Sequence, residues 1–168
     1  MQYIRYAWQL LQHKWHVFNL CRKEGIWWLG IVHDLSKLRP SEFISHARYF
    51  GVPESKRTDK RKFAMDRAWA LHLKRNKHHW QYWVTLDDSG SAYIFPMPLN
   101  YVLEMLCDWK ARAIYRDNTT LLEWYEDKAP LMHPSARSYV LFRINKDKWS
   151  EELLQLWKNT QASSSLIN

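Results

Sequence analysis

The stretch Ile31-Val32-His33-Asp34-Leu35-Ser36-Lys37 points more directly to a fold than any other part of this sequence. It follows an apolar run and places His33 beside Asp34. A neutral imidazole nitrogen next to a carboxylate oxygen forms a mixed ligand pair that suits a divalent cation. Because such a dipeptide also occurs by chance, its weight depends on candidate ligands elsewhere in the chain: His13 before it, and His72, His78, His79 and Asp108 after it.

The composition predicts one compact domain with an anionic partner. The chain has 168 residues, of which 46% are hydrophobic, and it carries a net charge of +8 with His neutral. We expect a single domain over residues 1–160 and a polar tail over 161–168. The charge is typical of proteins that bind a nucleotide, nucleic acid or a membrane surface, although a solvated basic surface would give the same balance.

Two further features predict a cytoplasmic protein without a membrane partner. The N-terminal residues lack the apolar core of a signal peptide, and no apolar run approaches the ~20 residues that a membrane span needs. Cys21 and Cys107 both fall in apolar helical patterns. We therefore expect free thiols in a reducing compartment rather than a disulfide framework.

Apolar periodicity predicts an all-α fold. Helices are expected over residues 3–23, 26–37, 40–50, 58–76 and 99–116, and Thr120, Pro134 and Ser150 mark the starts of three more. The first helix has two apolar sides, so we expect it to be largely buried. One side carries Ile4, Trp8, Leu11, Trp15 and Phe18, and the other carries Leu10, His13, Val17 and Leu20. Other core candidates are Phe63, Trp69, Leu73, Val102, Met105, Leu106, Trp109 and Ala113.

One segment departs from helical periodicity. Aromatic and β-branched runs flank the turn residues 87–90, which favours a small β-hairpin at about 82–95. Trp80, Tyr82 and Trp83 beside it could stack on a nucleobase, but packing against the core is the first expectation.

The candidate ligands have ordinary interpretations when each is taken alone. His13 could be a hydrogen-bonded core residue, Asp108 a carboxylate at a helix rim, and His78-His79 a surface pair. His16, His46 and His133 are not expected to bind metal. A helical protein can nevertheless build a metal site from His and carboxylates that project inward from several helices, and the joint occurrence of these residues favours that interpretation.

The order His…His-Asp…Asp resembles the HD superfamily of metal-dependent phosphohydrolases. The string His33-Asp34-Leu35-Ser36-Lys37 is similar to the His-Asp-x-Gly-Lys of that superfamily, with Ser36 in place of Gly. The segments 40–43 and 76–83 look like an uncharacterised HD-like family met in bacteria and phages. The resemblance covers about residues 10–130 and implies an HD-domain-like helical bundle.

The resemblance also implies a ligand set of one or two divalent ions per chain, drawn from Mn, Fe, Ni, Co, Zn and Mg. A one-metal site would use His13, His33, Asp34 and Asp108, and a two-metal site would add His72, His78 and His79. The spacing from His72 to His78 is shorter than in two-metal HD enzymes, where these ligands usually lie on different helices.

The activity implied by the resemblance is hydrolysis of a nucleotide or related phosphoester by metal-activated water. Asp34 would ligate or bridge the metal. Lys37 would contact the phosphate or the nucleophile, although a cation at a helix end is the ordinary alternative. Glu42 and Glu104 are candidate proton carriers. The cations expected to bind substrate are Lys37, Arg39, Lys74, Arg75 and Lys77.

Two other functions fit the same sequence. Basic charge with interleaved aromatic residues suits a module that binds single-stranded nucleic acid. An HD-like scaffold can also bind a metal or a partner without catalysis, because a fold does not fix a function.

Overall fold

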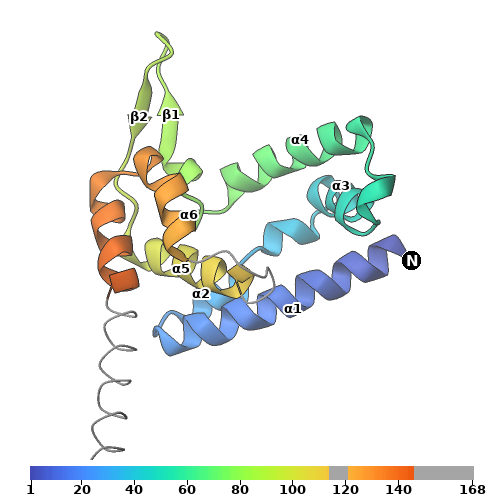
Figure 1. The fold of residues 1–168 in the computed structure, drawn as a ribbon, viewed down its shortest axis with the longest axis horizontal. Coiled ribbons are helices and arrows are strands. Elements are labelled where there is room, and N and C mark those ends of the chain that lie inside the picture. Colours follow the sequence, from blue (N-terminus) through green and yellow to red (C-terminus); the bar gives the residue numbers. More distant parts are fainter. Residues whose placement is uncertain (114–120, 146–168) are drawn as a thin grey trace, which may run out of the picture.

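A computed structural model describes residues 1–113 and 121–145 of the chain (Figure 1). In these residues the fold is all-α with one small antiparallel hairpin, as predicted. The α-helices are α1 (Gln2–Lys23), α2 (Trp27–Val32), α3 (Pro40–Phe50), α4 (Asp59–Arg75), α5 (Leu99–Ala113) and α6 (Leu121–Lys128), and a further helix covers 134–145. Short 3₁₀ segments are η1 (Leu35–Leu38), η2 (Glu54–Lys56), η3 (Trp80–Trp83) and η4 (Ala129–Leu131).

Helix starts and stops follow the local signals in the sequence. Pro40 is the first residue of α3, where its missing N–H costs nothing, and Gly51 follows the last residue. Thr58 caps α4 by accepting a hydrogen bond from the amide of Arg61. The predicted starts at Thr120 and Ser150, the end of the 99–116 helix and the 161–168 tail lie outside the described residues.

The expected helix over 26–37 is wrong, because the chain breaks at the dyad. α2 ends at Val32, and Asp34 adopts a left-handed conformation with φ 56° and ψ 18° before η1 begins. That conformation is unfavourable for residues other than Gly, and Asp and Asn are among the few that tolerate it. The break turns the carboxylate of Asp34 away from the helix surface and into the protein.

The buried core forms three clusters around the centre of the molecule. One joins α1, α2 and α5 through Val17, Cys21, Ile26, Leu29, Cys107 and Ala111, and both cysteines are free, as expected. A second joins α1 to α3 through Tyr6, Leu10 and Ala47. The third packs α5 against the 134–145 helix through Met97, Val102, Met105, Leu106, Trp109, Met132, Ala136 and Val140.

Only one of the two apolar sides of α1 is buried. Tyr6, Leu10, Val17 and Cys21 face the core, whereas Ile4, Trp8, Leu11 and Trp15 are exposed, so the expectation of a largely buried helix is wrong. Phe63 on α4 is also exposed, against expectation. Periodicity identifies an apolar side, but it does not say which side meets another element.

The hairpin projects beyond the helices in Figure 1. β1 (Val84–Leu86) pairs antiparallel with β2 (Ala92–Ile94), and Thr85 lies opposite Tyr93. Trp80 and Trp83 pack against the third core cluster, as the first expectation for them stated, while Tyr82 is exposed. None of the described helices is long and apolar enough to cross a membrane.

Candidate metal centre

The centre of the molecule is polar where the core clusters meet. His13 lies on the inner side of α1, one turn from Leu10 and one turn from Val17, so the helix phase that buries these two residues also directs His13 inward. On α5, Glu104, Asp108 and Arg112 are spaced four residues apart and share one side of the helix. The core therefore positions both helices for a site between them.

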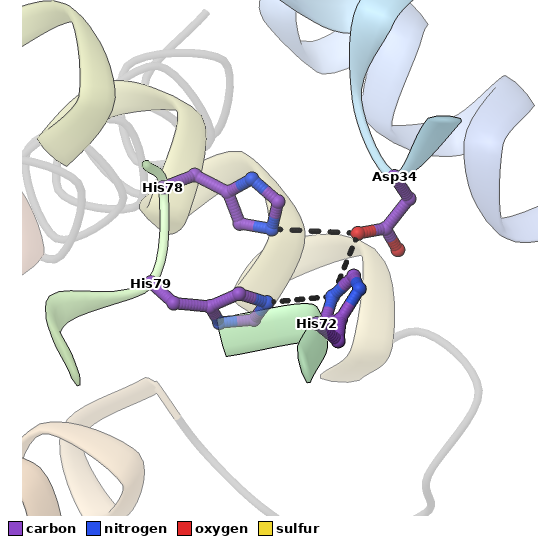
Figure 2. A group of neighbouring side chains, drawn as sticks. All are labelled: Asp34, His72, His78 and His79. Carbon is purple, nitrogen blue, oxygen red and sulfur yellow. Dashed lines mark hydrogen bonds and ion pairs between the residues drawn. The ribbon is translucent and has the colours of Figure 1, made fainter. Parts of the chain in front are cut away.

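The other ligands come from two breaks in helical structure. His33 and Asp34 occupy the turn after α2. His72 lies in the last turn of α4, and His78 and His79 lie in the segment between α4 and η3 (Figure 2). The short spacing from His72 to His78 is accommodated because the chain leaves the helix between them and turns back toward Asp34.

Asp34 lies between two groups of candidate ligands. Its Oδ2 faces the first ligand group, at 4.0 Å from Nε2 of His13 and 3.5 Å from Nε2 of His33. The Oδ1 of Asp108 joins this group at 2.9 Å from His13 Nε2 and 3.8 Å from His33 Nε2. We define the first ligand group as His13, His33, Asp34 and Asp108.

The second ligand group consists of Asp34, His72, His78 and His79. Asp34 Oδ1 lies 3.1 Å from Nε2 of His72 and 3.5 Å from Nε2 of His78, and Nε2 of His79 lies 2.9 Å from that of His72 (Figure 2). All four residues are buried, and their ligand atoms lie close enough together to hold one ion. One carboxylate thus serves both groups through its two oxygens.

Carboxylates behind the imidazoles fix which nitrogen faces the centre. Glu104 Oε1 lies 2.9 Å from Nδ1 of His33 and 3.1 Å from Nδ1 of His78, and Glu42 Oε2 lies 2.9 Å from Nδ1 of His72. An Nδ1–H that donates to a carboxylate leaves the lone pair of Nε2 pointing inward. Metal-binding His residues are commonly oriented in this way.

The inward atoms form an excess of acceptors. The Nε2 atoms of His13, His33 and His78 and the Oδ1 of Asp34 are buried and have no hydrogen-bond partner of good geometry within the described residues. The short distances from His13 to Asp108 and from Asp34 to His72 are therefore contacts without hydrogen-bond alignment. Buried polar atoms are nearly always satisfied, and lone pairs that face one another repel. A cation bound between these atoms would satisfy the buried acceptors and remove the repulsion between their lone pairs. The donor set therefore fits a divalent metal that accepts N and O ligands.

The pKa shifts favour the protonation states that bind metal. Burial is the largest single effect on Asp34 and Asp108 and opposes their ionisation. The charge of Lys37 at Asp34 and of Arg112 at Asp108, added to the nearby His side chains, outweighs burial, so the pKa of each carboxyl is well below its usual range. Burial lowers the pKa of His33, which keeps the imidazole neutral. Burial also lowers the pKa of His79, and that shift is larger.

His78 differs from these histidines. Burial would lower the pKa of His78, but the hydrogen bond to Glu104 and the charge of Asp34 outweigh it, so the pKa is raised. Protonation of His78 therefore competes with metal binding at its Nε2, and metal affinity should fall as the pH falls.

A cavity of about 800 Å³ opens beside the first ligand group, and His13, Lys37 and Arg112 are among its lining residues. The Nζ of Lys37 lies 2.5 Å from Asp34 Oδ2, and the Nε of Arg112 lies 3.1 Å from Asp108 Oδ1. Sequence reasoning missed Arg112, although its spacing of four residues from Asp108 was a usable signal.

The other cations expected to bind substrate do not line this cavity. Arg39, Lys74, Arg75 and Lys77 are exposed. Arg75 donates to Glu42 Oε1 at 2.6 Å, so it supports the carboxylate behind His72. Lys77 lies 5.7 Å from the centroid of the Tyr101 ring. The structure brings all seven predicted ligands together and, of the five predicted substrate cations, places Lys37 beside them.

Comparison with family models matches residues 2–146 to DUF5662, which is described as a family of unknown function. The match covers most of the chain, carries no activity with it and does not show membership of an HD family. Neither the curated proteins nor the solved structures contain a match.

Proposed function

This chain belongs to the DUF5662 family, and from its buried His and Asp centre we propose that it is a metal-dependent phosphohydrolase of the HD type. Its substrate would be a nucleotide or a related phosphoester. The observation that carries the proposal is the cluster of unsatisfied acceptor atoms on His13, His33, Asp34 and His78, next to an open cavity. A structural metal site is usually closed, whereas a catalytic one keeps access for substrate.

The residues around the centre can take separate roles in phosphoester hydrolysis. Bound divalent ions would supply a water of lowered pKa and would polarise the phosphoryl oxygen. Asp34 would hold both ligand groups at a fixed separation through its two oxygens. Lys37, which lines the cavity and contacts Asp34 Oδ2, would hold a proton where the leaving oxygen departs. Arg112 would hold Asp108 in place and face the phosphate.

The test measures metal content and turnover on the same samples. Purified protein would be loaded with Mn, Co, Ni, Zn or Mg and assayed against an aryl phosphate, nucleotides and cyclic nucleotides. We expect stoichiometric metal and turnover with at least one ion. His33→Ala should lose the ion of the first ligand group together with turnover, whereas His133→Ala, a change at a His outside the centre, should keep the full metal content and the activity. Stoichiometric metal without turnover of any phosphoester would instead support a non-catalytic metal-binding scaffold.

A further inference from the structure

The cavity runs along two helices away from the ligand groups. Its lining includes Tyr6 and Leu10, which precede His13 on α1, and Met65 and Trp69, which precede His72 on α4. Met65 is seven residues from His72, which corresponds to about 10 Å along a helix axis. Figure 1 shows that α1 and α4 both run from the side of α3 toward the centre. The cavity therefore has a metal end and a distant apolar end.

Flat rings line the cavity between its metal end and its apolar end. Trp69 stacks on His72 with centroids 5.2 Å apart and planes at 24°, and Tyr6 stacks on His46 with planes at 8°. The stacked partners hold these rings in fixed orientations, and both rings line the cavity. Fixed aromatic faces are suited to binding another flat ring, because stacking requires no hydrogen-bond match.

The metal end has few cations that are not already paired with a carboxylate. Among the described lining residues, Lys37 and Arg112 are the only Lys or Arg side chains, and each already pairs with a carboxylate of the first ligand group. The remaining charged lining residue is Asp66, on α4 six residues before His72. A second or third phosphate would therefore extend from the metal end toward apolar side chains and an acid. Burying such a charge without a partner is costly.

We propose that this cavity selects a phosphomonoester with one phosphate and a flat, largely apolar group, and that it discriminates against the di- and triphosphates of the same compound. The phosphate would lie at the metal end beside Lys37 and Arg112, and the flat group would lie between the walls formed by Tyr6 and Trp69. This inference rests on the proposed function, because it assigns the substrate class of the same site.

The experiment compares four probes on the metal-loaded protein: adenosine mono-, di- and triphosphate, and ribose 5-phosphate. We expect kcat/KM for the monophosphate to exceed that for the triphosphate by about tenfold or more, since each unpaired phosphate charge is penalised. The monophosphate should also exceed ribose 5-phosphate by about tenfold, because the sugar lacks the stacking ring. A uridine series would show whether the preference holds for a second ring.

Two variants test the two ends separately. Because Trp69 also stacks on His72, the comparison is between substrates: Trp69→Leu should raise KM for the monophosphate about tenfold more than it raises KM for ribose 5-phosphate. Phe63→Leu is its control, because Phe63 lies on the same helix, is exposed and does not line the cavity. Asp66→Asn removes the acid and releases Lys62, whose Nζ lies 2.8 Å from Asp66 Oδ2. It should reduce discrimination against the triphosphate about threefold, as expected for an exposed charge.

The outcomes separate this inference from the proposed function. Equal or better turnover of the triphosphate, or equal turnover of ribose 5-phosphate, would overturn the inference and leave phosphohydrolysis intact. If metal binds and no phosphoester is hydrolysed, the proposed function fails. Calorimetric binding of the mono- and triphosphate to the metal-loaded protein then decides the inference, because tighter binding of the triphosphate would overturn it and tighter binding of the monophosphate would support it.

Discussion

The two ligand groups share Asp34 but are built in different ways. The first draws its other residues from α1, the turn after α2, and α5, which are separate segments of the sequence, and His13 within it is half-buried beside the cavity. The second takes His72, His78 and His79 from one stretch of eight residues, and all three are buried. Tertiary packing thus positions the first group, whereas a local break in the chain positions the second.

This difference predicts which residues couple the groups. Asp34 contributes one oxygen to each group, and Glu104 orients one imidazole in each, His33 in the first and His78 in the second. Glu42 and Ser36, by contrast, contact His72 alone among the candidate ligands. Substitutions can therefore be ranked by whether they affect both groups or one.

The largest effect is expected from Asp34→Asn. Asn tolerates the left-handed backbone that Asp34 adopts, so the turn should persist while both groups lose their charged ligand. We expect metal content to fall from about two ions to none and activity to fall by more than about 100-fold. Elemental analysis of the dialysed protein measures the metal content, and turnover of an aryl phosphate measures the activity. Retention of two tightly bound ions would show that Asp34 is not shared.

A smaller loss of metal should follow from removing one ligand of the first or of the second group while Asp34 is kept. His13→Ala and His72→Ala should each reduce metal content by one ion, because the opposite group keeps its remaining ligands. The measurement is elemental analysis together with the rise in Tm on adding metal, which should be smaller in each variant than in the wild type. Loss of both ions in either variant would mean that the two groups form a single cooperative site.

Glu104→Gln should weaken both groups without removing either. The amide preserves shape, but its oxygen is a poorer acceptor for two imidazole N–H groups than the carboxylate oxygen is. Loss of an outer partner of a metal ligand typically costs about 10- to 100-fold in affinity. Chelator competition in the His13→Ala and His72→Ala backgrounds would measure each group separately. An effect confined to one background would show that Glu104 supports only one group.

The sequence allowed the first ligand group and most helix boundaries to be predicted. Proline, glycine and capping signals act locally, so Pro40 and Thr58 marked helix starts without knowledge of the fold. The direction of His13 also followed from helix phase, because its apolar neighbours share its side of α1. The order of the ligands along the chain then predicted that they converge.

Features set by tertiary packing could not be predicted in the same way. The left-handed Asp34 breaks a continuous apolar pattern that carries no Gly or Pro between 31 and 38. The choice between the two apolar sides of α1 depends on where α3 and α5 pack, which periodicity does not encode. Glu104 is an ordinary acid in the sequence, and its importance appears only when His33 and His78 approach it from two other segments.

The smallest effect is expected at Ser36, which stands where the HD pattern that the sequence resembles has glycine. Ser36 Oγ donates to Glu42 Oε2 at 2.8 Å and accepts from Asn76 Nδ2 at 2.7 Å, so it supports the carboxylate behind His72. Ser36→Ala should weaken metal binding by the second group about fivefold, which corresponds to the net value of one hydrogen bond, about 1 kcal/mol, and should leave the first group unchanged.

Chelator competition in the same two backgrounds measures the Ser36 effect, with Ser89→Ala in the exposed hairpin turn as the matched control. Glu42 keeps its contact with Arg75 in the variant, and this contact limits the loss. A fivefold change in the His72→Ala background, where the first group alone binds metal, would contradict the separation of the two groups. Such a result would mean that removing the Ser36 hydroxyl shifts the whole turn after α2. Both oxygens of Asp34 would then move, and both ligand groups would be affected.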